Sequence, residues 1–121
     1  MSDGRRALAT VLVCQGCCCG HPEKGNPEIP RAHLEAVWRE RQLEHAVRLR
    51  FVDCIGPCEP ANLAVVKLSG EAVWLAGLTG GHEYDALADW AEQTRDAGAP
   101  AALSVTLTER QIPAPRTDLP E

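Results

Sequence analysis

The sequence has no apolar run long enough to cross a membrane and no excess of positive charge. Its N-terminal apolar run, residues 7–14, is short and contains Thr10, whereas a transmembrane helix needs about 20 apolar residues. No signal-cleavage pattern follows this run. The formal net charge is −5 at pH 7, which argues against nucleic acid as a partner. We therefore expect a cytoplasmic protein that binds neither membrane nor nucleic acid.

Patterns that carry enzyme chemistry are also missing. The chain shows no nucleophile–base pair, no phosphate-binding loop and no paired catalytic carboxylates. It shows no internal repeat. At 121 residues it is long enough to bury an ordinary core as one unit. These absences favour a carrier or binding protein over an enzyme.

Cysteine, by contrast, is abundant, with six residues in two clusters. The first cluster is Cys14-Gln-Gly-Cys17-Cys18-Cys19 and the second is Cys54-Ile-Gly-Pro-Cys58. A disulfide framework is typical of small secreted chains that lack a core, so metal binding or redox chemistry fits better. Each cluster follows a strand-like run, residues 7–14 or 47–53. Neighbouring strands that end at the same edge would bring four thiolates together.

The pattern of apolar and turn residues predicts the order β-α-β-β-β-α. A Gly- and Pro-rich loop follows the first strand, and a helix begins after Pro30 with Leu34, Val37 and Trp38 at helical spacing. Two runs flanking Ser69-Gly70 form a hairpin. The last helix covers 83–97 and ends at Gly98 and Pro100. This order predicts a thioredoxin-like α/β fold: a mixed sheet with helices.

The predicted domain spans residues 1–98, and residues 99–121 form a C-terminal extension. Residues 103–108 alternate in polarity, which predicts an edge strand or a segment docked on a neighbour. A loose tail follows from Gln111. The predicted core consists of Leu12, Leu34, Val37, Phe51, Val65, Leu87 and Ala91.

Four thiolates suit a [2Fe–2S] cluster, in which two cysteines hold each iron. Zinc is the alternative, because it also prefers soft sulfur ligands. The spacing of Cys14 and Cys17 fits a zinc knuckle, but Cys54 and Cys58 stand one residue further apart than that pattern requires. A dithiol oxidoreductase would place Cys-x-x-Cys at the start of the first helix, whereas a Gly-rich loop follows these cysteines.

The spacing Cys-x4-Cys, then residues 20–53, then Cys-x3-Cys on this order of elements resembles the thioredoxin-like [2Fe–2S] ferredoxins. That family includes the small iron–sulfur subunit of bacterial NADH dehydrogenases, and the resemblance covers residues 7–95. The Cys54–Cys58 loop is similar to the second ligand loop of the family. The run Cys17-Cys18-Cys19-Gly20 resembles a subgroup of small ferredoxin-domain proteins often found with cobalamin-biosynthesis genes.

The resemblance implies a [2Fe–2S] cluster held by Cys14, Cys19, Cys54 and Cys58, with Cys18 or Cys17 as the alternative to Cys19. It also implies a one-electron carrier between redox partner proteins, and a cobalamin or other tetrapyrrole pathway is a candidate setting for it. The two surplus thiols are expected to be tolerated loop residues, or else to exchange with a ligand during cluster or metal transfer. Two other functions stay open: metal binding or delivery in a cobalamin or other tetrapyrrole pathway, and a structural zinc domain. A homodimer also stays open.

Four arginines lie near the end of the first helix and in the second strand-like run: Arg39, Arg41, Arg48 and Arg50. Their spacing predicts a solvated face. The alternative is a surface that docks an acidic partner.

Overall fold

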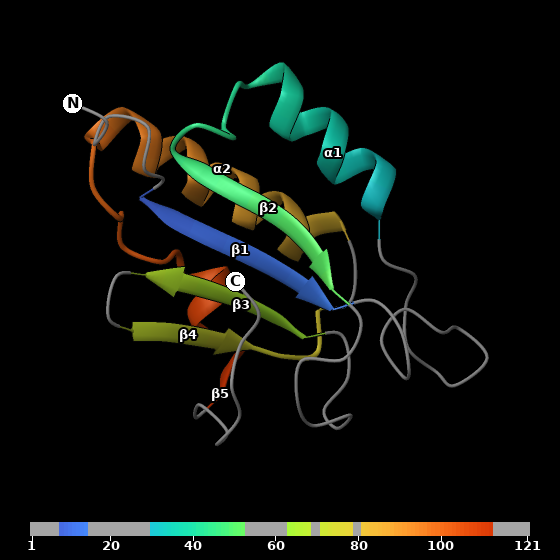
Figure 1. The fold of residues 1–121 in the computed structure, drawn as a ribbon. Coiled ribbons are helices and arrows are strands. Elements are labelled where there is room, and N and C mark those ends of the chain that lie inside the picture. Colours follow the sequence, from blue (N-terminus) through green and yellow to red (C-terminus); the bar gives the residue numbers. More distant parts are fainter. Residues whose placement is uncertain (1–7, 15–29, 53–62, 69–70, 79–80, 113–121) are drawn as a thin grey trace.

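The computed structural model describes residues 8–14, 30–52, 63–68, 71–78 and 81–112 (Figure 1). Their elements, in chain order, are β1 (Ala9–Cys14), α1 (Arg31–Glu40), β2 (Val47–Val52), β3 (Ala64–Leu68), β4 (Glu71–Leu75), α2 (Gly81–Ala97), α3 (Val105–Thr108) and β5 (Gln111–Ile112).

The strands form one mixed sheet in the order β2-β1-β3-β4-β5. β1 and β2 are parallel, and the other three pairs are antiparallel. α1 is the crossover that the parallel pair requires, and β3 and β4 form the predicted hairpin. The prediction of an α/β fold with a mixed sheet is confirmed, and the arrangement is compatible with a thioredoxin-like fold.

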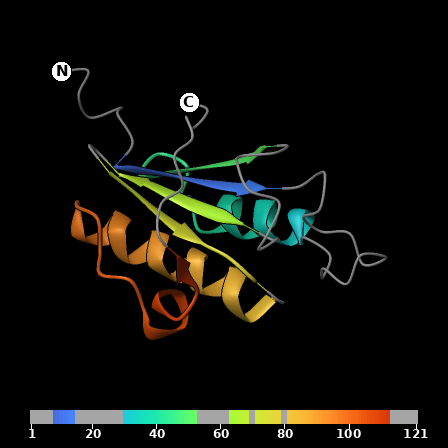
Figure 2. The same cartoon turned by 90° about the horizontal axis from the view of Figure 1, so that it is seen from below.

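Both long helices lie on one face of the sheet (Figure 2). β1 is buried on both faces, since its residues alternate between two hydrophobic clusters. Val11 and Val13 pack in the cluster that contains residues of α1 and α2. Leu12 and Cys14 belong to a second cluster on the opposite face. Because both faces of β1 are buried, its sequence is a nearly continuous apolar run.

α1 begins directly after Pro30, its N-cap residue, whose carbonyl accepts the N–H of Leu34 at 3.0 Å. It buries Leu34 and Trp38, which lie one turn apart on the same face. The indole Nε1 of Trp38 donates a hydrogen bond to the carbonyl of Val47, 2.8 Å away. This bond ties the end of α1 to the start of β2.

α2 buries the apolar stripe that the sequence predicts: Tyr84, Leu87, Ala88 and Ala91. It ends at Gly98, which has a φ of 74° and donates its N–H to the carbonyl of Thr94 at 2.9 Å. Glycine adopts this left-handed conformation without the Cβ clash that other residues meet. Of the seven predicted core residues, five are fully buried, and Val37 and Phe51 are half-buried at the margin.

The prediction of a strand over residues 103–108 is wrong, because residues 105–108 form helix α3. A strand would place Leu103, Val105 and Leu107 on one face. Instead Leu107 is fully buried, and Val105 is 71% exposed. Leu103, which precedes α3, is partly buried against the same core as Leu107. The extension does supply an edge strand, but it is the two-residue β5, paired with β4.

The extension is fixed to α2 through hydrogen bonds at Ala101. Its N–H donates to Oγ1 of Thr94 at 3.0 Å, and its carbonyl accepts from Nε1 of Trp90 at 2.7 Å. Further along, Arg110 Nη2 lies 3.0 Å from Oε2 of Glu83, which is buried near the start of α2. Residues 101–110 are therefore held against α2, and residues 111–112 join the sheet. The predicted loose tail from Gln111 is wrong for its first two residues, because Gln111 and Ile112 form β5; the rest of it, residues 113–121, lies outside the described residues.

None of the helices described is both long enough and apolar enough to cross a membrane.

Candidate metal centre

The two strands that precede the cysteine clusters end side by side. β1 and β2 are parallel, and in their register Cys14 lies opposite Val52. Neighbouring strands are about 4.8 Å apart. Cys54 follows Val52 by two residues in the sequence, so the two strands that lead to the cysteine clusters end at the same edge of the sheet (Figure 1). The strand geometry predicted from the sequence is therefore present.

The chain also returns to this edge after the second cluster. The N–H of Cys14 donates to the carbonyl of Leu63 at 3.0 Å, and β3 then runs antiparallel to β1. Cys14 thus lies between Val52, which precedes residues 53–62, and Leu63, which follows them. Residues 15–29 begin directly after Cys14. The three described residues Cys14, Val52 and Leu63, next to which these segments begin or end in the sequence, are thus neighbours in the sheet.

Cys14 is 2% exposed and lies on the sheet face opposite the helices. It packs in a cluster with Leu12, Leu63, Val65, Trp74 and Ala76. The cluster is apolar and keeps bulk water away from the end of β1. A thiolate at this position would be shielded from solvent on its protein side.

Both long helices begin at the edge where β1 and β2 end, as both ribbon views show (Figures 1 and 2). α1 does so because it connects two parallel strands and must run opposite to them. The N-terminus of a helix carries a partial positive charge. On the helix side of the sheet, this edge therefore favours a group with negative charge, whereas Cys14 packs on the opposite side.

Of the predicted ligands, the structure describes only Cys14. Cys17, Cys18, Cys19, Cys54 and Cys58 lie outside the described residues, so the complete ligand set stays a prediction. Within the described ranges, no three His, Cys, Asp or Glu side chains come close enough to share a metal ion. What the structure establishes is the position of the strand ends from which the two clusters leave.

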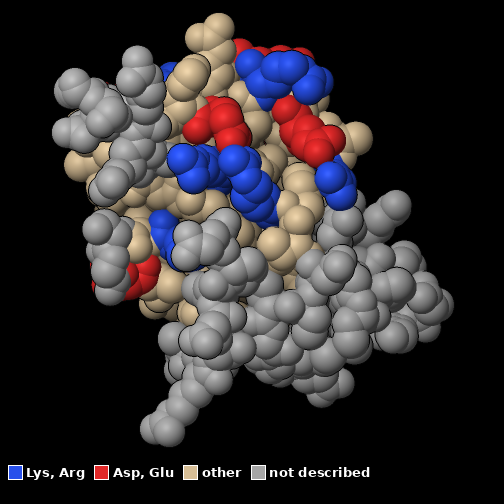
Figure 3. All heavy atoms as spheres, viewed as in Figure 1, with Lys and Arg blue, Asp and Glu red and all other residues tan. Residues whose placement is uncertain are grey.

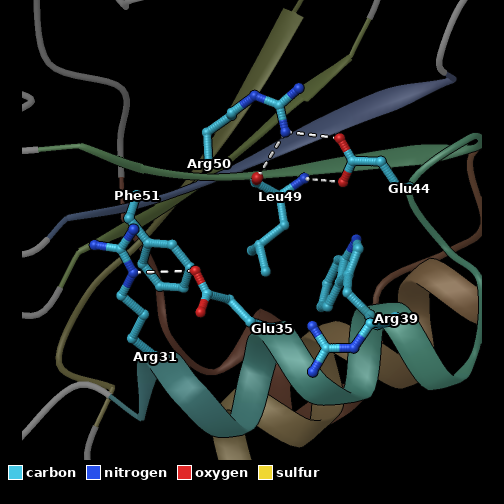
Figure 4. Close-up of a pocket in the computed structure, with 8 residues that line it drawn as sticks. Arg31, Glu35, Arg39, Glu44, Leu49, Arg50 and Phe51 are labelled. Carbon is cyan, nitrogen blue, oxygen red and sulfur yellow. Dashed lines mark hydrogen bonds and ion pairs between the residues drawn. The ribbon is translucent and has the colours of Figure 1, made fainter.

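The sequence does not reveal a groove between α1 and β2, with a volume of about 460 Å³. It is lined by Arg31, Glu35, Trp38, Arg39, Glu44, Leu49, Arg50 and Phe51 (Figure 4). The i, i+4, i+8 spacing of Arg31, Glu35 and Arg39 places them on one side of α1. This spacing, which is visible in the sequence, predicts that the three side chains lie together on α1. It does not show that β2 lies opposite them.

The four predicted surface arginines have three different environments. Arg41 lies 2.9 Å from Asp89 and 3.1 Å from Glu92, which ties α1 to α2. Its hydrogen bond to Asp89 raises the pKa of Arg41 above its ordinary value. Arg50 pairs with Glu44. Arg39 and Arg48 form no ion pair within the part of the chain that the structure describes.

No protein-family model, curated protein or solved structure matches this chain.

Proposed function

We propose that this protein is a [2Fe–2S] ferredoxin-like one-electron carrier that passes electrons between redox partner proteins and has no substrate of its own. The observation that carries the proposal is the alignment of Cys14 with Val52 at the ends of two parallel strands. A cysteine loop leaves from each of these ends. The same edge receives the chain again at Leu63.

The donor set fits the cofactor. Cys14, Cys54 and Cys58 supply three thiolates, and Cys19, or alternatively Cys18 or Cys17, supplies the fourth. Four cysteine thiolates are the usual ligands of a [2Fe–2S] cluster. When bound, such a cluster accepts and releases one electron at a time.

The protein's own residues contribute position and environment. The hydrogen bond from Cys14 to Leu63 holds the end of β1 against the start of β3. The apolar cluster around Cys14 excludes water, and lower exposure is one of the factors that set the potential of such centres. The N-termini of α1 and α2 begin at the same edge, on the face of the sheet opposite Cys14, and favour negative charge on that side.

Metal analysis of anaerobically purified protein tests the proposal. About two irons and two sulfides per chain are expected, with the red-brown colour and visible absorption of a [2Fe–2S] centre. One zinc and no sulfide per chain would refute the carrier function.

The surplus of cysteines favours a second candidate, metal or cluster delivery, with a cobalamin or other tetrapyrrole pathway as its setting. A delivery protein needs a thiol that can exchange with a ligand, and Cys17 and Cys18 are extra thiols beside the first cluster. Transfer to a metal-free acceptor, followed by loss of colour from this protein, separates delivery from electron transfer. A colourless protein with tightly bound zinc indicates the structural zinc alternative.

A further inference from the structure

We infer that the groove between α1 and β2 docks an acidic segment of the redox partner that carries an apolar side chain. This inference rests on the proposed electron-carrier function. It concerns the partner's chemistry and the surface that recognises it.

The floor of the groove is apolar. Leu49 is 9% exposed, and Phe51 is half-buried beside it. The guanidinium of Arg31 covers the Phe51 ring at 4.7 Å from its centroid, and its Nε binds Glu35 at 3.1 Å. Figure 4 shows the Leu49 side chain reaching from β2 toward α1, between these residues and Arg39. An apolar side chain of a partner would find contacts here.

The charge around this floor is positive although the chain as a whole is negative. Arg31 is neutralised by Glu35 and Arg50 by Glu44, whereas Arg39 has no ion-pair partner among the described residues. Figure 3 shows Lys and Arg side chains gathered over β2 and α1, with acidic residues between them. The whole chain has a net charge of −5, yet here Arg39 is an unneutralised cation beside an apolar floor. This combination is complementary to a partner that carries a carboxylate next to an apolar residue.

At Leu49, the backbone of β2 is not free to form hydrogen bonds with a partner strand. The N–H of Leu49 donates to Oε1 of Glu44 at 3.3 Å, and its carbonyl accepts from Nη1 of Arg50 at 2.8 Å. A partner strand pairing with β2 would need both groups free. Docking in the groove must therefore use side chains.

The position of the groove suits electron transfer. Phe51, at one end of the groove, directly precedes Val52, which lies opposite Cys14. β2 thus leads from the groove to the edge where β1 and β2 end, although Cys14 itself faces the other side of the sheet. A partner seated here would lie near the edge from which the chain continues toward the cysteines of the second cluster, and electron transfer requires such an approach.

A fluorescence-anisotropy titration tests the inference on the full-length, cluster-loaded protein. The probe is a labelled six-residue peptide of glutamate and leucine, compared with a peptide in which lysine replaces each glutamate. We expect binding of the acidic peptide, weakened by salt, and much weaker binding of the basic one. Arg39→Gln should weaken binding about fivefold, since it removes the unneutralised cation.

Arg48→Gln is the matched control. Arg48 is also an exposed arginine without an ion pair among the described residues, but it does not line the groove. We expect less than about a twofold effect, because it contributes only long-range attraction. Circular dichroism of both variants verifies that the fold is unchanged.

Equal weakening by both substitutions, or equal binding of both peptides, would overturn the docking surface. Iron and sulfide are measured in the same samples. Failure of peptide binding in protein that contains the cluster refutes the docking surface alone. Absence of iron and sulfide refutes the proposed function, and with it the assignment of the groove to a redox partner.

Discussion

The carboxylate of Glu44 and the guanidinium of Arg50 lie 2.7 Å apart beside the outer edge of β2, and each also binds one backbone group of Leu49. Together they satisfy the N–H and the carbonyl of that residue. The carbonyl of Val47 is likewise occupied by Trp38. Within the described sheet β2 is an edge strand, and unpaired edge groups invite pairing with other chains. The ion pair therefore protects this edge from self-association.

Removing the pair should expose the edge. In the double variant Glu44→Ala/Arg50→Ala, we expect increased self-association because the backbone groups of Leu49 become available to another chain. The free energy of unfolding should fall by only about 1 kcal/mol, as is usual for exposed ion pairs. Size-exclusion chromatography with light scattering measures the first effect and urea denaturation the second.

The control is Arg31→Ala/Glu35→Ala, which removes a similarly exposed ion pair on α1 that binds no strand backbone. Both double variants should lose similar stability, but only the β2 variant should associate. If the two double variants show the same molar mass over the same concentration range, the assignment of a protective role to Glu44 and Arg50 is wrong.

Substitution of the predicted ligands tests the metal centre directly. Cys54→Ser and Cys58→Ser should each lose or strongly destabilise the cluster, because a hydroxyl is a poorer and harder donor than a thiolate. Cys14→Ser should do the same. Cys17→Ser, the control within the first cluster, should be nearly silent. Iron and sulfide content and visible absorption are the measurements, and full retention of the cluster in Cys54→Ser would contradict the ligand assignment.

The link between α2 and the extension yields a stability prediction. Thr94→Val keeps the side-chain volume but removes the oxygen that accepts the N–H of Ala101. Thr94 is fully buried, so the loss should cost about 1–3 kcal/mol in the free energy of unfolding. Urea denaturation measures it. Thr108→Val, at an exposed site whose hydroxyl bonds only within α3, should change stability by less than about 0.5 kcal/mol. Equal effects would mean that the Ala101 contact does not stabilise the fold.

The parts of the fold that local pattern determines are predictable from the sequence. β1 is apolar throughout because both of its faces are buried, and α2 carries its apolar stripe at helical spacing and ends at a glycine. Residues 103–108 are ambiguous, since Leu103, Val105 and Leu107 fit a strand period while Leu103 and Leu107 alone fit a helix. Packing of Leu107 under α2 decides between them, and packing is a tertiary property.

The candidate metal centre is also predictable in part, because local sequence patterns determine the strands that lead to it. A cysteine stands at or just after the end of each strand-like run. If the two strands are parallel neighbours, their ends lie at the same edge of the sheet, and the pairing of Cys14 with Val52 meets this condition. The α1–β2 groove is different. It brings Arg39 near Leu49 across two elements, and no local pattern in either element specifies that contact.

The fold itself should survive removal of the metal, which distinguishes this protein from a zinc finger. The described residues bury two hydrophobic clusters, one on each face of the sheet, with Val11, Leu34 and Leu87 in the larger one. Burial of this apolar surface stabilises the fold without any ligand, whereas classical zinc fingers are unfolded without their metal. We expect chelated, reduced protein to keep most of its far-ultraviolet circular dichroism and to unfold cooperatively. Its melting temperature should be lower than that of the metal-loaded form, because a ligand that binds only the native state adds to stability. A random-coil spectrum after chelation would show instead that the metal, and not the two apolar clusters, holds β1, β2 and the helices together.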